Sequence, residues 1–412
     1  MDEQQDIIFD WNLTSGPPFA GKTVELLDES LREGLQSPSV IDPRPEDKLH
    51  LVRLLDALGV SVVNIGFPGA GPRAAADAAA LARAIADERL RIRPACAART
   101  LASDITPIVE ISQASGLRVE VMAFIGSSPV RQYAEGWDVA EVARLSSTAI
   151  DLGVRHGLPV TYVNEDSVRS SPQSLEILFR TAIDHGAHRL CLCDTVGHAT
   201  AAGVQGIVAF TRDIIARSGT RVGIDWHGHN DRGLALSNAL AAIEHGADRV
   251  HGTALGLGER VGNPPIELLL LNLRLGAATA GDLTRITEFA TAAARAFQVA
   301  VPFNYPLVGR DAFRTATGVH AAAILKAERK GHTWLADRVY SGVPAGLFGR
   351  TQEIEISHQS GEANVVCWLL RRGLAQDAAL VSAILRRAKE SRSTLSNDEV
   401  EAVVRAHAEP PP

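Results

Sequence analysis

One junction recurs along roughly the first 250 residues and constrains the fold more than any other feature of the chain. A helix-forming stretch ends at a glycine, and a short apolar run begins within one to three residues. The glycines are Gly59, Gly116, Gly157, Gly186, Gly219 and Gly246. Glycine just past a helix adopts the left-handed conformation at little steric cost. The runs that follow are apolar on both faces, which is typical of parallel strands covered by helices.

The spacing of these junctions predicts the architecture. Successive glycines are 57, 41, 29, 33 and 27 residues apart, and the longest interval holds one further helix (74–88) and strand (89–97). A period of about 30 residues is the length of one strand–helix unit. With residues 23–28 as the first strand, eight strands are complete by Ala254. We therefore predict an α/β fold, a (β/α)8 TIM barrel.

A doubly wound open sheet is the alternative architecture. That fold more often carries a glycine-rich phosphate-binding turn after its first strand. Here the corresponding turn, residues 28–36, reads DESLREGLQ and contains a single glycine. The barrel is therefore the favoured prediction.

The chain divides into four predicted regions. An N-terminal arm covers residues 1–22, the catalytic barrel 23–278, and a linker helix and loop 279–312. In the linker helix, Ile286, Phe289, Ala293 and Phe297 share one face. A smaller mixed, mainly helical region at 313–412 is expected to form a lid and dimerisation region, and its last residues, 408–412, to be a frayed tail. The spacing of Ser396 and Glu399 predicts a capping box at a helix start.

Composition excludes several classes of protein. The chain is 46% apolar and 22% charged, which is ordinary for a globular protein. A net charge of -7 argues against a nucleic-acid partner, and no apolar run reaches the length of about 18 residues needed to span a bilayer. From its acidic residues, the N-terminal segment is expected to be neither a signal nor a transit peptide. Cys191 and Cys193 are expected as buried reduced thiols, so we predict a cytoplasmic protein without a membrane partner.

Polar side chains follow nearly every predicted strand. Active sites of barrels lie at this end of the strands. The residues of greatest interest there are Arg32, Glu33, Gln36, Arg131, Glu165, Arg169, Thr195, His227, His229 and Asn263. Core packing does not explain such a concentration of polar groups, so the sequence predicts a catalytic site at this mouth.

The pair His227 and His229 is the sharpest local signal. Residues two apart on a strand project to the same side. Two neutral imidazoles and one carboxylate, for which Glu33 is the best candidate, make a metal site with open positions. The alternative is two loop histidines that only form hydrogen bonds. Arg32 is interpreted either as a cation aimed at a developing alkoxide or as part of a surface salt bridge.

The remaining histidines lack comparable polar neighbours in the sequence. They are interpreted as structural residues: His185, His188, His198, His245 and His251. The glycines Gly256, Gly258 and Gly262 do not have the order of a nucleotide-binding loop, so we expect them to allow close backbone packing beneath the site.

Together these segments resemble the DRE-TIM metallolyase superfamily, and within it the 2-isopropylmalate synthase and homocitrate synthase family. DESLREGLQSP resembles the family opening DxxLRxGxQ, and NEDSVRS resembles SxEDxxR. DTVG, HGHNDRG and GTALGLGERVGNPPIE match the next three motifs, and TGVHAAAILKAE resembles the lid motif SGxHxxxxLK. The similarity runs from about residue 23 to about residue 370, with the motifs in the family's order.

The resemblance implies an acyltransferase that condenses acetyl-CoA with a 2-oxo acid and releases CoA. It implies that Glu33, His227 and His229 bind a divalent cation (Mg2+, Mn2+ or Zn2+), with Asn263 at or near the metal. It assigns oxyanion stabilisation to Arg32, acid–base roles to Glu165 and His320, and binding of the 2-oxo acid to Thr195 and Arg169. Gln36 is expected to contact substrate. A homodimer is implied, in which His320 reaches the partner's barrel.

The chain departs from the family pattern at two places. The family's lid tyrosine is replaced by Trp334, so either Tyr340 substitutes for it or the proton follows a different route. In the loop after the fourth strand, Arg131 stands where synthases often carry a histidine. Arg131 is interpreted either as the partner of a second anionic group on the acceptor or as a solvated loop arginine that pairs with Glu135. The acceptor itself stays open among 2-oxoisovalerate, 2-oxoglutarate, pyruvate and phosphonate analogues of oxaloacetate.

Two other functions compete with the synthase. One is a lyase of the same superfamily that cleaves a hydroxyacyl-CoA, although the loop GLGERVGNP lacks the cysteine such lyases carry there. The other is a metal-stabilised barrel that only binds or regulates. The intact set of Arg32, Glu33, His227 and His229 favours an enzyme over this last possibility.

Overall fold

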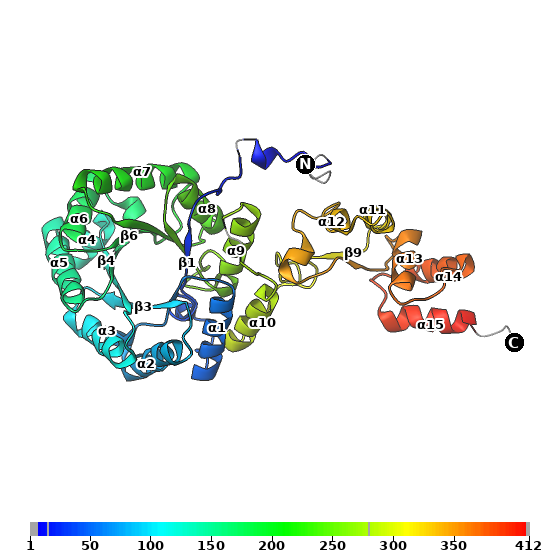
Figure 1. Ribbon diagram of the computed structural model, residues 1–412, viewed down its shortest axis with the longest axis horizontal. Coiled ribbons are helices and arrows are strands. Elements are labelled where there is room, and N and C mark those ends of the chain that lie inside the picture. The colour runs from blue at the N-terminus through cyan, green and yellow to red at the C-terminus, as the bar shows by residue number, and fades with distance from the viewer. Residues whose placement is uncertain (1–6, 15, 279–280, 409–412) are drawn as a thin grey trace. The chain divides into compact units, whose positions relative to one another are not determined.

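The computed structural model describes residues 7–14, 16–278 and 281–408. Eight parallel strands close into a barrel, which confirms the predicted (β/α)8 fold (Figure 1). The strands are β1 (Glu25–Asp28), β2 (Val62–Asn64), β3 (Arg93–Arg99), β4 (Glu120–Gly126), β5 (Val160–Glu165), β6 (Arg189–Asp194), β7 (Gly223–Gly228) and β8 (Arg249–Gly252). Each strand pairs with the next, and β8 pairs with β1 to close the ring.

Helices surround the ring of strands on its outer side (Figure 1). They are α1 (Pro45–Ala57), α2 (Pro72–Asp87), α3 (Ala102–Ser115), α4 (Pro129–Glu135), α5 (Val139–Arg155), α6 (Pro172–Asp184), α7 (Ala201–Ser218), α8 (Ala235–His245), α9 (Ile266–Leu275) and α10 (Ile286–Phe297). All six junction glycines have positive φ angles, as the sequence predicts. The side chains on the predicted apolar face of α10 are fully buried.

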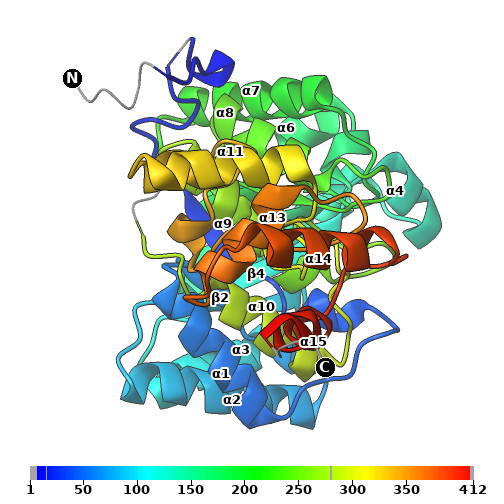
Figure 2. The same cartoon turned by 90° about the vertical axis from the view of Figure 1, so that its right-hand side faces the viewer.

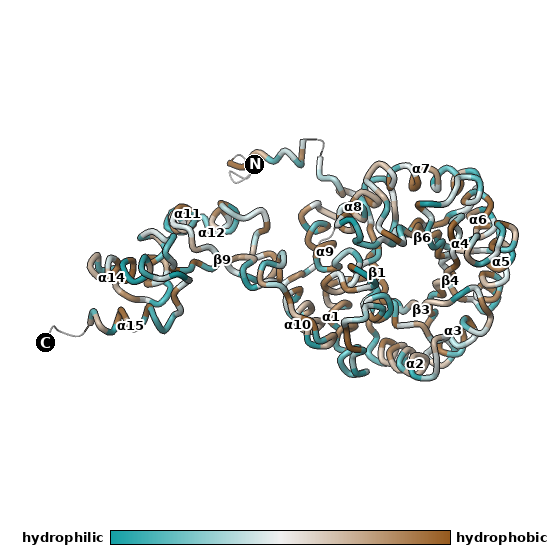
Figure 3. The backbone as a smooth tube through the Cα atoms, turned by 180° about the vertical axis from the view of Figure 1, so that it is seen from behind, coloured by the Kyte–Doolittle hydropathy of each residue, from teal (hydrophilic) through white to brown (hydrophobic). Residues whose placement is uncertain are grey.

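The barrel interior is filled by side chains that alternate along each strand. Leu27, Val62, Ala95 and Met122 form a buried cluster against which Val163 packs. β4 is hydrophobic along most of its length (Figure 3). Side chains two residues apart on a strand face the same side. On each strand, the residue two positions after the cluster member therefore points into the barrel at its carboxyl-end mouth.

A buried ion-pair network lies on the other side of this cluster. The fully buried guanidinium of Arg249 donates to Asp225 at 2.7 Å and to Glu120 at 2.9 Å. Burial alone would raise the pKa of the Glu120 carboxyl, but Arg249 lowers it to about 2. The barrel therefore holds ionised groups below its apolar layer, and each has a partner of opposite charge.

The chain separates into two compact units. The first comprises residues 1–282 and 288–300, and the second comprises 283–287 and 301–412. The second unit contains β9 (Arg314–Thr315), α11 (Gly318–Arg329), α12 (Thr333–Ala336), β10 (Glu353–Ile354), α13 (Glu362–Leu370), α14 (Ala378–Lys389) and α15 (Asn397–Ala408). Helices α13, α14 and α15 lie side by side (Figure 2). Their buried side chains form one apolar core.

Local signals in this unit agree with the sequence. Ser396 Oγ accepts a hydrogen bond from the Glu399 amide, and the Glu399 carboxylate accepts one from the Ser396 amide, so the predicted capping box is confirmed. Four residues of the predicted frayed tail, 409–412, lie outside the described residues. None of the helices in the described part of the chain combines the length and apolar character needed to cross a membrane.

Candidate active site

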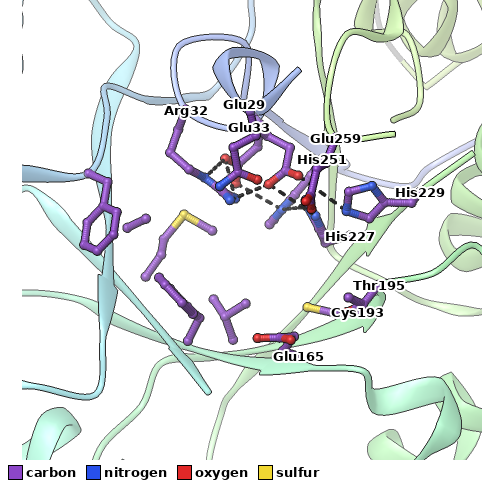
Figure 4. A pocket seen from close by; sticks show the side chains of 16 residues that line it. Glu29, Arg32, Glu33, Glu165, Cys193, Thr195, His227, His229, His251 and Glu259 are labelled. Carbon is purple, nitrogen blue, oxygen red and sulfur yellow. Dashed lines mark hydrogen bonds and ion pairs between the residues drawn. The ribbon is translucent and has the colours of Figure 1, made fainter. Parts of the chain in front are cut away.

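A cavity of about 240 Å3 opens where the carboxyl ends of the barrel strands meet (Figure 4). Its polar lining comes from the ends of β1, β5, β6, β7 and β8 and from the loops that follow them. The residues that the sequence predicted and that line this cavity are Arg32, Glu33, Gln36, Glu165, Thr195, His227 and His229. The other lining residues were not among the site residues predicted from the sequence, and they are Glu29, Phe67, Ala97, Met122, Phe124, Val163, Cys193, His251 and Glu259.

The predicted metal donors lie together on one side of this cavity (Figure 4). Glu33 Oε1 lies 3.4 Å from His229 Nε2, and Glu33 Oε2 lies 3.9 Å from His227 Nε2. The separations exceed an ordinary hydrogen bond and suit donors that share one cation. All three side chains are buried. Carboxylate and imidazole donors in this arrangement fit a divalent cation with open positions.

The protonation of the histidines suits metal binding. Burial lowers the pKa of His227 well below its ordinary value, and the neighbouring His229 and His251 lower it further. Burial also lowers the pKa of His229, although the Glu33 carboxylate opposes this effect. Both rings are therefore neutral at pH 7, which is the form that binds metals.

Asn263 lies buried in the loop after β8, outside the lining of the cavity. Its Nδ2 donates to the carbonyl of Gly228, and its buried Oδ1 has no hydrogen-bond partner among the described residues. A Cβ at Gly258 would stand 1.9 Å from that oxygen. Gly258 thus permits the close packing expected for this loop. The position of Asn263 as a metal ligand stays a prediction.

Arg32 is held at the cavity wall by two carboxylates. Its guanidinium donates to Glu29 Oε2 at 2.8 Å and also to Glu33. Burial alone would lower the pKa of Arg32, but the two carboxylates raise it. Its side chain is 17% exposed, so this is a largely buried cation rather than a surface salt bridge. A cation fixed in this way can stabilise negative charge that develops in the cavity.

His251 was interpreted as structural from the sequence, but it lines the cavity and contacts a metal-donor candidate. Its Nδ1 lies 3.3 Å from His227 Nδ1, and its Nε2 lies 3.1 Å from Asp225 Oδ2. Contacts of this kind orient the rings of ligating histidines. The signal that could have identified His251 is strand periodicity, because it lies two residues after Arg249 and faces the same interior.

Glu165 and Thr195 lie across the cavity from Arg32 (Figure 4). Burial raises the pKa of the Glu165 carboxyl, while Arg131 opposes the rise. Thr195 Oγ1 accepts a hydrogen bond of 2.8 Å from the Asp166 amide. That contact leaves the hydroxyl hydrogen of Thr195 as a donor at the cavity.

The two other predicted substrate ligands lie outside the lining of the cavity. Arg131 pairs with Glu135 at 3.1 Å and approaches Glu165 at 3.5 Å. Arg169 donates to both carboxylate oxygens of Asp166 at 2.7 Å. Their contacts with substrate stay predictions. The two cysteines expected as buried thiols are free and buried, and Cys193 reaches the cavity.

His320 lies in the second unit, on α11. Its ring stacks on Tyr340 with centroids 3.9 Å apart and planes 24° apart. Trp334 does not share this stack, and its buried Nε1 has no hydrogen-bond partner among the described residues. Of the two residues that could take the place of the lid tyrosine, Tyr340 is therefore the one stacked on His320.

Comparison with known proteins agrees with the resemblance seen in the motifs. Homocitrate synthase AksA of Methanopyrus kandleri is 30% identical over 390 residues, covering 93% of this chain and 92% of its own length. A protein of Methanosphaerula palustris named as a candidate (R)-citramalate synthase, CimA, is 30% identical and covers 90% of this chain and 69% of itself. Homocitrate synthase of Pyrococcus horikoshii is 28% identical, and the match covers 91% of this chain and 97% of that protein.

Solved structures show the same barrel. Hydroxymethylglutaryl-CoA lyase of Pseudomonas aeruginosa aligns with a TM-score of 0.56 at 21% identity, over 66% of this chain and 93% of that one. The HMG-CoA lyase of Brucella melitensis gives 0.55 at 20% identity, over 68% and 100%. At these identities the likeness concerns the fold alone. The HMGL-like family model matches residues 23–292, which span the whole barrel and the site at its mouth, and the chain belongs to that family.

Proposed function

We propose that this barrel condenses acetyl-CoA with a 2-oxo acid and releases CoA, using a divalent cation bound by Glu33, His227 and His229. The observation that carries the proposal is the meeting of those three donors with Arg32 in one cavity. The relatives named homocitrate synthase support the same reaction, because the similarity covers both the barrel and the region after it. The enzyme is thus an acyltransferase of the condensing type.

A cation at the three donors would hold the carboxylate and keto oxygens of the 2-oxo acid and withdraw charge from the keto carbon. Glu165 takes a proton from the acetyl methyl group, since burial raises its basicity toward the range useful for a base. Arg32 stabilises negative charge on the former keto oxygen. The Thr195 hydroxyl donates a hydrogen bond to the 2-oxo acid.

The overall chemistry requires water. A carbon–carbon bond forms between the acetyl methyl carbon and the keto carbon, and the former keto oxygen takes up a proton. Water then cleaves the thioester, which leaves a new carboxylate and the CoA thiol. Thioester hydrolysis makes the condensation effectively irreversible.

The test is the appearance of free thiol. The full chain is mixed with acetyl-CoA, a panel of 2-oxo acids and, in separate reactions, Mg2+, Mn2+ or Zn2+. Thiol release that requires both a 2-oxo acid and a cation supports the proposal, and the three reactions rank the metals. Formation of acetyl-CoA from a hydroxyacyl-CoA, with no thiol release in the condensing direction, would identify a lyase instead.

The proposal includes a cytoplasmic homodimer in which His320, stacked on Tyr340, serves the partner's barrel as an acid–base residue. The test uses heterodimers of His320→Ala and Glu33→Ala chains, each inactive alone. If sites are shared, one of the two sites in each heterodimer carries both intact residues, and activity returns to about half that of the wild type. No recovery in heterodimers verified by two affinity tags would place His320 over its own barrel.

A further inference from the structure

We propose that the acceptor is a 2-oxo acid with an apolar, aliphatic side chain, and that Ala97, Met122, Phe124 and Val163 form the wall that selects it. This inference rests on the proposed condensation and narrows its substrate. Those four residues come from β3, β4 and β5, and all of them line the cavity.

The register of the strands makes these side chains one continuous surface. Ala97 is the partner of Met122 across β3 and β4, and Phe124 is the partner of Val163 across β4 and β5. Met122 and Phe124 lie two residues apart and so face the same side. Phe67, from the loop after β2, extends this surface through an edge-to-face contact with Phe124 at 5.9 Å.

This apolar wall lies away from the metal donors in the ring of strands. The donors come from β7 and from the turn after β1, whereas the wall comes from β3 to β5. The carboxylate and keto groups of a 2-oxo acid are adjacent. With both held at the donors, the remaining substituent of the keto carbon extends away from the donors, toward the wall.

The charges of the cavity disfavour an acceptor with a second carboxylate. Among the described lining residues, Arg32 is the single guanidinium, and it is already paired with Glu29 and Glu33. Glu165 and Glu259 add two further carboxylates to the lining. A distal carboxylate would lose its hydration against methyl and aromatic groups without gaining a cation.

Arg131 does not supply the missing cation in the arrangement described. It is engaged with Glu135 and Glu165 and lies outside the lining. Its Nε has no hydrogen-bond partner among the described residues, and a dianionic acceptor would have to compete with both carboxylates for this guanidinium. The hypothesis that Arg131 binds a second anionic group predicts a preference for dianionic acceptors. The apolar wall predicts the opposite preference, for aliphatic acceptors.

The first experiment compares acceptors with the full wild-type chain. The aliphatic set is 2-oxobutanoate, 2-oxoisovalerate and 4-methyl-2-oxopentanoate, and the dianionic set is oxaloacetate and 2-oxoglutarate. We expect kcat/KM from thiol release to be at least 100-fold higher for the best aliphatic acid. Equal or higher values for a dianion would overturn the inference while leaving the condensation intact.

Acceptor binding is also measured without acetyl-CoA, by calorimetry in the presence of the cation. If no acid gave thiol release, the proposed condensation would fail. Tighter binding of the aliphatic acids in that case would still support the apolar wall, whereas tighter binding of the dianions would refute it. The two proposals are thus tested separately.

A variant of the wall gives the sharpest test. Phe124 is only partly buried, so Phe124→Lys can place an ammonium group in the cavity without disturbing the deepest core. In Phe124→Lys, the ratio of kcat/KM for 2-oxoglutarate to kcat/KM for the best aliphatic acid should rise at least 100-fold. The matched Phe124→Leu variant should keep the wild-type preference for aliphatic acids.

A second variant of the wall, Ala97→Leu, adds bulk without charge. It should lower kcat/KM for 4-methyl-2-oxopentanoate more than for 2-oxobutanoate. An unchanged order in all folded variants would exclude these residues as the selecting wall.

Discussion

The Nδ1 atoms of His227 and His251 lie 3.3 Å apart inside the barrel, and Asp225 holds the far side of the His251 ring. Burial alone would raise the pKa of Asp225, but Arg249, His251 and Arg189 lower it, so the carboxylate is ionised and can only accept. In a neutral His251 ring, Nε2 then carries the hydrogen and Nδ1 accepts one from His227. This leaves the Nε2 lone pair of His227 facing Glu33.

We therefore expect His251→Phe to weaken cation binding about 10- to 100-fold, which is the usual effect of losing a partner of a ligating histidine. Calorimetric titration with Mn2+ or Zn2+ measures this without reference to turnover. His251→Gln keeps a polar group near His227, so its affinity for the cation should fall less than that of His251→Phe. Equal affinities in wild type and His251→Phe would show that the contact does not orient His227 for binding.

Arg32 should affect turnover more than substrate binding. The negative charge it faces develops on the former keto oxygen only as the new bond forms. We predict that Arg32→Ala lowers kcat about 10²- to 10³-fold and raises KM for the 2-oxo acid much less. Steady-state kinetics with saturating acetyl-CoA measure both terms. Arg32→Lys retains the positive charge but cannot pair with both carboxylates in the same way. Its kcat should lie between those of the wild type and Arg32→Ala. A change confined to KM would remove Arg32 from this role.

The acidic limb of the pH–rate profile should depend on Arg131. Burial raises the pKa of Glu165, and Arg131 at 3.5 Å opposes the rise. A base must be ionised, so kcat/KM increases as the pH rises through the pKa of Glu165. Removing the opposing cation in Arg131→Ala raises that pKa further and moves the limb to higher pH.

Activity of this variant relative to wild type should accordingly fall more at pH 6 than at pH 9. Arg131→Lys keeps the positive charge and should leave the limb near its original position. Profiles of kcat/KM between pH 5 and 9.5 for the three proteins provide the comparison. A limb that does not move in Arg131→Ala would mean that a different group titrates in this range.

The barrel was predictable because its signals are local. A glycine with positive φ after each helix and an apolar run after each glycine are properties of short segments, and all six junctions were found in the structure. The gathering of Arg32, Glu33, His227 and His229 was predictable for a related reason, since closure of the barrel brings all strand ends to one mouth.

The remaining lining was not predictable in the same way. Whether Glu29, Cys193 or His251 faces the cavity depends on strand register and on the depth of each residue in the barrel, and both are set by contacts with neighbouring strands. Arg169 shows the converse. Its sequence neighbourhood places it beside the site, yet Asp166 holds it through two hydrogen bonds outside the lining of the cavity.

The lid phenol gives the last prediction. Tyr340 stacks on His320. The indole ring of Trp334, in contrast, cannot transfer a proton at neutral pH. If the hydroxyl of Tyr340 takes part in proton transfer with His320, Tyr340→Phe keeps the stack and loses the proton, and kcat should fall about 10- to 100-fold with little change in KM. Trp334→Phe should keep kcat within about two-fold, because an aromatic ring of smaller size still fills that place. Thermal melting of both variants shows whether the unit stays folded. A larger loss in Trp334→Phe than in Tyr340→Phe, with both proteins folded, would show that the stacked phenol does not carry the proton.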